Sequence, residues 1–236
     1  MNQQNLSVPI AIVVAGVFIA GALFFAGRGS APSPTANGSH ETAGDAENVA
    51  AVTASEHILG NPDADIVLIE YSDIECPFCK QFHITMKQIM NEYGKDGRVA
   101  WVYRHFPIAQ LHQNAPRLAE ASECVAELNG NTAFWAFVDE VFAIAPVNTF
   151  FPMGQLTATA GKVGVNAEAF DACLASGRHK STVEDQFNNA VASGGQGTPH
   201  NIIVTKAGQI IPLPGAQPYS TVKNVIDAIL AETPHQ

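Results

Sequence analysis

The chain has 236 residues with 22 acidic and 12 basic side chains, so its formal net charge at pH 7 is −10. This acidic balance disfavours binding to nucleic acids and to anionic lipid headgroups, and no internal repeat is visible. Beyond its N-terminal segments, about 180 residues remain, which is enough for one domain with a sizeable hydrophobic core.

Residues 1–27 predict a membrane anchor. No residue before Arg28 is charged, and residues 8–26 are almost wholly apolar; at ~1.5 Å per residue they nearly span a ~30 Å hydrocarbon core. A cleaved signal peptide usually has a basic start, a shorter apolar core and a small-x-small cleavage site, whereas residues 1–5 are neutral here. We favour the anchor over the signal peptide. Either one places the rest of the chain outside the cytoplasm.

Residues 28–55 are predicted to form a flexible linker. They are rich in Gly, Ser, Pro, Ala and Thr and lack apolar periodicity, a composition that cannot bury a core. The folded part is therefore expected to begin near residue 56.

A Cys-x-x-Cys motif follows the first predicted strand. The apolar run at residues 66–71 predicts a buried strand, and Cys76-Pro77-Phe78-Cys79 begins a predicted helix that ends near Gly94. At a helix N-terminus, unpaired backbone N–H groups and the helix dipole favour a thiolate at Cys76. Cys79 returns to the same helix face, and Pro77 suits the first turn because it has no N–H.

Three other interpretations of this motif are weaker. A zinc site needs two further ligands at matched spacing, and Cys124 and Cys173 stand far apart. A c-type haem site needs His after the second cysteine, where this chain has Lys80. A structural disulfide in so short a loop would remove little chain entropy. The motif therefore predicts a redox-active dithiol.

The rest of the pattern predicts a second strand, a helical block and a C-terminal β-β-α unit. Residues 98–104 predict a strand that runs parallel to the first, because a helix connects the two. Apolar residues at helical spacing predict helices over residues 114–128, 134–142, 166–174 and 183–191, the first capped by Asn114 and the third by Asn166. Strands are predicted at residues 201–205 and 210–211, and a last helix over residues 220–231.

The region around the motif resembles the DsbA-like thiol–disulfide oxidoreductases. The resemblance is carried by residues 70–80 (EYSDIECPFCK) and by Gly197-Thr198-Pro199 before a predicted strand, and it covers roughly residues 56–232. It implies an α/β thioredoxin fold interrupted by an inserted helical domain, here preceded by the N-terminal transmembrane segment. Residues 56–111 and 193–236 would form the thioredoxin-like domain and residues 112–192 the helical insertion.

The resemblance also implies roles for individual residues. Cys76 would be the nucleophile that forms the mixed disulfide with substrate, and Cys79 the buried resolving thiol. Pro199 would be a cis-proline that faces the dithiol, and Thr198 would offer backbone groups to an extended substrate peptide. Glu70 would be a buried acid that exchanges a proton with Cys79; the alternative is a solvent-facing carboxylate at the strand end.

Pro77 and Phe78, between the two cysteines, are expected to bind substrate and to tune the reduction potential. The strongest oxidants of the family have a histidine inside the motif, and this chain has none there, so its oxidising power stays open. Asp73 and Glu75 are expected to face water near the rim of the site.

The histidines outside the motif are expected to play minor parts. His83, one helical turn further on, could partly replace the histidine missing from the motif, but we expect it at the surface. Only His105 and His200 are expected near the site, and the others, including His112, in the linker, at the surface or in the core.

Cys124 and Cys173 lie in the predicted helical block, each beside an apolar face. Two interpretations are open: free buried thiols, or a structural disulfide that joins two helices. Outside the cytoplasm an unpaired buried pair is unusual, which favours the disulfide.

Together these features predict a protein disulfide oxidoreductase, anchored in the membrane with its catalytic domain in the periplasm or at the cell surface. We expect it to introduce disulfides into cysteine-containing exported proteins and to be reoxidised by a membrane redox partner, as a monomer without metal or cofactor. The alternatives are a reductase or isomerase on the same fold, and a non-enzymatic thioredoxin-fold binding module or chaperone.

Overall fold

The computed structural model describes residues 46–144 and 150–232. The expected membrane anchor, residues 1–27, lies outside these ranges, as do residues 28–45 of the expected linker. Among the residues it describes, no helix is long and apolar enough to span a bilayer.

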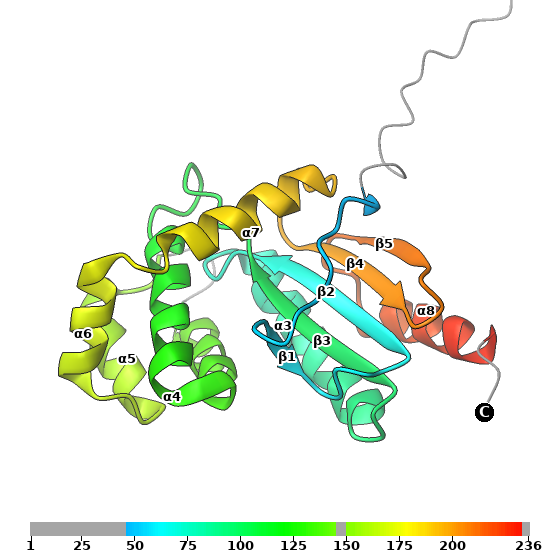
Figure 1. Ribbon diagram of the computed structural model, residues 1–236, viewed down its shortest axis with the longest axis horizontal. Helices are drawn as coiled ribbons and strands as arrows, with labels where there is room; N and C mark the ends of the chain where they lie inside the picture. The colour runs from blue at the N-terminus through cyan, green and yellow to red at the C-terminus, as the bar shows by residue number, and fades with distance from the viewer. Residues whose placement is uncertain (1–45, 145–149, 233–236) are drawn as a thin grey trace, which may run out of the picture. The chain divides into compact units, whose positions relative to one another are not determined.

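A five-stranded sheet is the centre of the described chain, with helices on both of its faces (Figure 1). The strands are β1 (His57–Leu59), β2 (Ile66–Ser72), β3 (Val99–His105), β4 (His200–Thr205) and β5 (Ile210–Pro214). The α-helices are α3 (Pro77–Ile89), α4 (Ala115–Ile144), α5 (Leu156–Lys162), α6 (Ala167–Ser176), α7 (Lys180–Ala192) and α8 (Tyr219–Glu232). A π-helical turn (Met90–Gly94) extends α3, and a 3-10 turn (Met153–Gln155) precedes α5.

The element order confirms the predicted α/β fold with helices inserted between β3 and β4. Two elements, β1 and α5, were not predicted from the sequence. Strand β1 has only three residues, and α5 has seven, mostly small and polar ones. Neither is long enough to show a clear apolar period.

The strands lie in the order β1-β3-β2-β4-β5. Strands β2 and β3 are parallel, with Ile66 opposite Val99, and α3 connects them. Strand β4 is antiparallel to β2, so the start of β4 lies beside the end of β2. This edge of the sheet is where α3 begins, and it is where the sequence places the Cys-x-x-Cys motif.

Each face of the sheet has its own hydrophobic core, because side chains alternate along a strand. Ile66 and Leu68 of β2 pack in the larger core with residues of α3, α4 and α8. Ile69 and Tyr71 of the same strand pack in a smaller core with Ala190 of α7. Helices α3 and α7 therefore cover opposite faces of the sheet (Figure 1).

Helix α4 is broken at Gly130, which has φ 78° and ψ 179°. These angles suit glycine because it lacks a Cβ atom. The break separates the two helices predicted at residues 114–128 and 134–142. Further on, the side chain of Asn166 caps α6 as predicted, accepting a hydrogen bond from the backbone N–H of Ala169 at 3.0 Å.

A disulfide between Cys124 of α4 and Cys173 of α6 joins two helices of the insertion. Both sulfurs lie in the larger core, where Cys124 is 1% exposed and Cys173 is fully buried. The bond closes a loop with a sequence separation of 49, for which the chain-entropy description gives about 4 kcal/mol of stabilisation.

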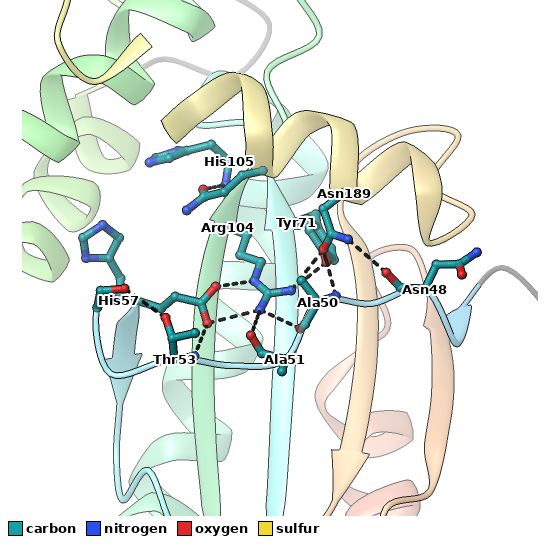
Figure 2. A network of polar contacts seen from close by, with 12 residues as sticks. Asn48, Ala50, Ala51, Thr53, His57, Tyr71, Arg104, His105 and Asn189 are labelled. Atoms are coloured by element: carbon teal, nitrogen blue, oxygen red, sulfur yellow. Dashed lines mark hydrogen bonds and ion pairs between the residues drawn. The ribbon is translucent and has the colours of Figure 1, made fainter. Parts of the chain in front are cut away.

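Residues 46–56 are held against the sheet by the buried side chain of Arg104 (Figure 2). The guanidinium, on β3, donates to both carboxylate oxygens of Glu56, with Nε–Oε1 2.6 Å and Nη2–Oε2 3.1 Å. It also donates to the carbonyl of Ala50 at 2.9 Å and to the hydroxyl of Tyr71 at 2.8 Å. The Arg104 side chain is only 2% exposed.

Asn189 of α7 binds the same segment from the other side. Its Oδ1 accepts from the backbone N–H of Ala50 at 3.1 Å, and its Nδ2 donates to the carbonyl of Asn48 at 2.9 Å. Residues 46–55 are therefore part of the folded domain, contrary to the flexible linker expected over residues 28–55. Their composition predicted a flexible linker because it does not show that Arg104 and Asn189, far along the chain, bind their backbone groups.

Candidate active site

Cys76 lies at the N-terminus of α3, as the N-cap residue with extended backbone angles of φ −72° and ψ 125°. Pro77 occupies the first helical turn, and the carbonyl of Cys76 accepts the backbone N–H of Lys80 at 3.0 Å. Both cysteines of the motif carry free thiols. Phe78, between them, is 61% exposed.

The surroundings of Cys76 stabilise a thiolate. A hydrogen bond from the Cys79 thiol and further bonds from Thr198 and from the backbone N–H groups of Phe78 and Cys79 lower the pKa of Cys76 to about 6, against the opposing effect of burial. These backbone N–H groups are the unpaired donors of the first helical turn, which is the effect expected of this position.

Cys79 has the opposite character. Its side chain is fully buried, and burial raises the pKa of its thiol well above the ordinary value, as do the hydrogen bond to Cys76 and the negative charges of Cys76 and Glu70. The backbone N–H of Asp73 points at the Cys79 sulfur at 3.4 Å. At neutral pH the pair therefore carries one thiolate, on Cys76, and one thiol, on Cys79.

Glu70 is fully buried in the middle of β2, in register with Tyr103 of β3 and Asn201 of β4. Its Oε2 accepts a hydrogen bond from Nε1 of Trp101 at 3.0 Å. Burial is the main reason why the pKa of Glu70 is raised to about 8, so the carboxyl group is mostly protonated at pH 7. When the Glu70 carboxyl ionises, its negative charge raises the pKa of Cys79, so the protonation of the two groups is coupled.

The Thr198–Pro199 peptide bond is cis and lies directly before β4. The carbonyl oxygen of Thr198 lies 3.6 Å from the sulfur of Cys76. The glycines before it allow a close approach of the chain to α7, since a Cβ atom on Gly195 would lie 2.7 Å from the carbonyl oxygen of Ala190. The structure thus brings Thr198 against the dithiol from 122 residues away.

Asp73 does not face water as the sequence suggested, because it is only 1% exposed. One carboxylate oxygen, Oδ1, accepts the backbone N–H of Glu75 at 2.9 Å. The other, Oδ2, accepts the backbone N–H of Ile108 at 2.7 Å and lies 2.8 Å from Nδ1 of His112. Asp73 therefore connects the loop between β3 and α4 to the dithiol segment through hydrogen bonds.

Glu75 is also largely buried, contrary to expectation, and it binds the helical insertion. Its carboxylate accepts the backbone N–H of Phe151 at 2.8 Å and the backbone N–H of Asn114 at 3.1 Å. The side chain of Asn114, the predicted cap of the following helix, donates to the same carboxylate at 3.3 Å. The carboxylates of both acidic residues before Cys76 thus accept hydrogen bonds from backbone N–H groups. The sequence pattern does not identify these donors.

Among the histidines, His83 and His112 lie where the sequence did not place them. His83 is 4% exposed rather than on the surface; its Nε2 lies 2.6 Å from Oδ1 of Asp139, and its ring packs on Trp101. His112 contacts the dithiol loop through Asp73. No local signal marks His112, because the loop that carries it is brought to the site only by the packing of the insertion.

His105 and His200, the two histidines expected near the site, bind other partners. Nε2 of His105 lies 3.0 Å from a carboxylate oxygen of Glu123. His200 directly follows Pro199, its Nε2 lies 3.1 Å from the carbonyl oxygen of Ser193, and burial lowers its pKa.

Two clusters in the described residues contain side chains of the kinds that bind metals. In the first, Oε1 of Glu123 accepts from Nε2 of both His57 and His105, at 2.9 and 3.0 Å, so the three groups satisfy one another. In the second, Cys124 and Cys173 lie near His179, but their sulfurs are joined in the disulfide. Neither cluster includes the dithiol.

A family model described as Thioredoxin matches residues 52–228 of the chain. Solved structures with the same fold include BdbD from Bacillus subtilis in its oxidised form, with a TM-score of 0.65 and 23% identity over 75% of this chain and 93% of that one. Alpha-DsbA1 from Wolbachia pipientis has a TM-score of 0.68 and 22% identity, over 79% of this chain and 96% of its own. DsbA2 from Pseudomonas aeruginosa has a TM-score of 0.65 and 23% identity, over 79% and 100%.

Curated relatives match only in part. The chain is 39% identical over 87 residues to the Na(+)/H(+) antiporter NhaA 1 of Mycolicibacterium gilvum, which is 37% of this chain and 13% of that protein. It is 33% identical over 144 residues to the Na(+)/H(+) antiporter NhaA of Herminiimonas arsenicoxydans, 61% of this chain and 21% of that protein. The matched segments thus span about a fifth or less of these relatives, and the names of the whole proteins assign no activity to this chain.

Proposed function

The chain belongs to the thioredoxin family, and we propose that this DsbA-like protein disulfide oxidoreductase introduces disulfides into exported proteins through Cys76 and Cys79. The observation that carries the proposal is the contrast between the two thiols. A nucleophile with a pKa of about 6 begins α3, and a fully buried partner thiol with a raised pKa lies one turn away.

The contrast assigns the order of steps. In the oxidised enzyme, a substrate thiolate attacks the sulfur of Cys76; the Cys76–Cys79 bond breaks, and Cys79 leaves with the electron pair and takes up a proton. A second substrate thiolate then attacks the substrate sulfur of the mixed disulfide and releases Cys76 as a thiolate. The substrate loses two electrons and gains a disulfide, and the enzyme is left reduced.

Glu70 is the proposed proton donor for Cys79 in the first step. Its carboxyl group is mostly protonated at pH 7, and it is buried on the strand next to the dithiol. Stabilisation of the Cys76 thiolate favours the reduced enzyme over its disulfide, which drives oxidation of the substrate. A membrane redox partner would then reoxidise the dithiol.

The substrate-binding residues that we propose are Thr198, Pro77 and Phe78, with Pro199 opposite the dithiol. The Thr198 backbone next to Cys76 suits an extended peptide, because such a peptide pairs through its main chain. Phe78 exposes an apolar side chain, as do Leu111 and Phe150, each of which directly precedes a residue that contacts Asp73 or Glu75. Apolar contacts of this kind suit polypeptides that have not yet folded.

We further propose that residues 1–27 anchor the enzyme in the membrane, with the domain outside the cytoplasm. The apolar residues 8–26 support the anchor, and the Cys124–Cys173 disulfide supports an oxidising compartment. The full chain should pellet with membranes and resist carbonate extraction. A soluble form that begins near Gly29 would instead indicate a cleaved signal peptide.

A reductase on the same fold is the second candidate, because a Cys76 pKa of about 6 lies closer to the ~7 of thioredoxin than to the ~3.5 of DsbA. The deciding experiment is a titration of the Cys76/Cys79 couple against glutathione. A potential of about −120 mV supports the oxidase, and one of about −270 mV supports the reductase.

The activity itself is tested with the oxidised protein and a reduced, unfolded cysteine-containing substrate. Thiols of the substrate should disappear as thiols appear on the enzyme, and Cys76→Ser should abolish the transfer. A folded chain whose dithiol exchanges with neither the substrate nor glutathione would point to the non-enzymatic binding module.

A further inference from the structure

His112 and Asp73 form a charge pair next to the dithiol, and the proposed function does not use it. His112 lies in the loop between β3 and α4, and Nδ1 of its ring lies 2.8 Å from Oδ2 of Asp73. The Asp73 side chain is fully buried, whereas that of His112 is 17% exposed. The imidazole can therefore exchange protons with solvent while its partner cannot reach water.

The backbone of Asp73 contacts both cysteines. Its carbonyl accepts the backbone N–H of Cys76 at 3.0 Å, and its own N–H points at the sulfur of Cys79 at 3.4 Å. Asp73 therefore belongs to the same turn as the dithiol, and the negative charges of both Asp73 and Cys76 act on the ring of His112. Two neighbouring negative charges disfavour each other's ionisation, and a cation between or beside them reduces this effect.

Of the described groups that contact the Asp73 carboxylate, only His112 can carry a positive charge; the others are the backbone N–H groups of Glu75 and Ile108. The ionisable groups with the largest effects on His112 are Asp73, Cys76 and Glu75, all negative when ionised. The hydrogen bond to Asp73 is the main cause that raises the pKa of His112, and the charges of Asp73, Cys76 and Glu75 add to it. The imidazolium is thus coupled electrostatically to the thiolate.

We propose that His112 is a positioning residue of the redox site, whose imidazolium neutralises the buried Asp73 and thereby stabilises the Cys76 thiolate. The inference rests on the proposed function, since it concerns the reduction potential of the same dithiol.

The consequence is a coupling between His112 and the redox state. The disulfide carries no charge, whereas the reduced site carries a thiolate on Cys76, so a cation at His112 favours the reduced form. Loss of that charge should make the enzyme a weaker oxidant. Deprotonation of His112 at higher pH should have the same effect, so the potential should fall more steeply with pH in the range where His112 titrates.

The test compares the full chain with His112→Gln, which keeps a hydrogen-bond donor for Asp73 and removes the charge. Thiolate absorbance gives the Cys76 pKa, and a glutathione titration gives the equilibrium constant. We expect the pKa to rise, and the equilibrium constant for reduction of the enzyme to fall by about threefold to tenfold, where tenfold corresponds to about 30 mV.

Three further variants separate charge from structure. His112→Lys restores a cation and should return the potential toward the wild-type value. In an Asp73→Asn background, His112→Gln should have a smaller effect, because the hydrogen bond to Asp73 is the main cause that raises the pKa of His112 and the ring is then less protonated. His179→Gln removes a histidine that also pairs with a carboxylate, at Glu127, but lies outside the site, and it should leave the potential unchanged.

A folded His112→Gln variant with the wild-type potential and Cys76 pKa would overturn the inference and leave the proposed function intact. A His112→Lys variant that behaves like His112→Gln would overturn it too, because charge would then not be what matters. If the wild-type dithiol does not exchange with glutathione at all, the proposed function fails first.

Discussion

The two sulfurs of the dithiol differ in what surrounds them. Cys76 receives hydrogen bonds from Cys79, Thr198 and the first turn of α3, whereas Cys79 is enclosed by apolar side chains and by a buried acid. The same functional group therefore acquires a lowered pKa at one position and a raised pKa at the other. The difference can be measured directly from the reactivity of each thiol.

In the reduced protein, Cys76 should be alkylated quickly at pH 7 and Cys79 slowly. The rate at Cys76 should rise with pH, with a midpoint near the pKa of about 6, and level off above it. Mass spectrometry of protein quenched at set times locates the label, and Cys76→Ser is the control for reaction at Cys79. Equal rates at both sulfurs would contradict the assigned roles.

Glu70 should make the stability of the protein depend on pH in a direction that burial determines. Its pKa is 4.5 when unperturbed and about 8 in the folded state, so the folded protein holds a proton between these values that the unfolded chain has lost. The free energy of unfolding should therefore fall as pH rises through this window. Its full contribution is present below pH 4.5.

The measurement compares wild type with Glu70→Gln, which does not titrate, in the oxidised form so that the dithiol does not titrate either. Between pH 5 and pH 8, wild type should lose up to about 4 kcal/mol of unfolding free energy relative to Glu70→Gln, at about 1.4 kcal/mol per pH unit. Glu184→Gln, at an exposed position on α7, serves as the control. Parallel pH profiles for wild type and Glu70→Gln would show that the carboxyl does not titrate as stated.

At the scale of elements, the chain before β1 is fastened to β3 and α7 by polar contacts rather than by secondary structure. Arg104 is almost wholly buried, and its charge is compensated by Glu56. Removing one member of a buried ion pair leaves the other charged and unsolvated. Residues 46–56 therefore contribute to the stability of the domain.

Arg104→Leu should lower the free energy of unfolding by about 3–5 kcal/mol, because Glu56 and the carbonyl of Ala50 lose their partner. Denaturant unfolding measures the change, and limited proteolysis should cut residues 46–56 faster. Arg178→Leu is the matched control, since Arg178 also binds a glutamate, Glu127, through two nitrogens but at the surface. An equally small effect of both substitutions would contradict the role of Arg104.

At the scale of the whole molecule, the insertion contributes to the site as well as covering the sheet. Asp73 and Glu75 bind backbone groups of the loop before α4 and of Phe151, so the packing of the insertion shapes the surroundings of the dithiol. The disulfide between α4 and α6 strengthens this packing.

Replacing both Cys124 and Cys173 by alanine should lower the free energy of unfolding by about 4 kcal/mol. Denaturant unfolding without reductant gives the difference. In wild type, mild reductant should open Cys76–Cys79 first, because Cys124 and Cys173 are buried in the core. If the Cys124–Cys173 disulfide opened as readily as Cys76–Cys79, this order would be contradicted.

The sequence by itself determined the features that depend on neighbours along the chain. The apolar run of β2, the motif at the start of α3 and the apolar periods of the later helices predicted the element order. The Thr198–Pro199 dipeptide alone indicated an ordinary loop, and the glycine-rich residues 194–197 before it and the strand after it favoured the cis bond. Local propensity and periodicity are sufficient for such features because backbone geometry brings residues a few positions apart together.

Only the tertiary structure decided which polar residues are buried and which partners they bind. Asp73, Glu75, His112 and Arg104 are charged or titratable, and a sequence pattern places such residues at the surface. Their partners lie far along the chain, 39 residues away for Asp73 and His112 and 48 for Arg104 and Glu56. A buried charge is tolerated only where a partner satisfies it, and that partner is known only once the fold has brought the two segments together.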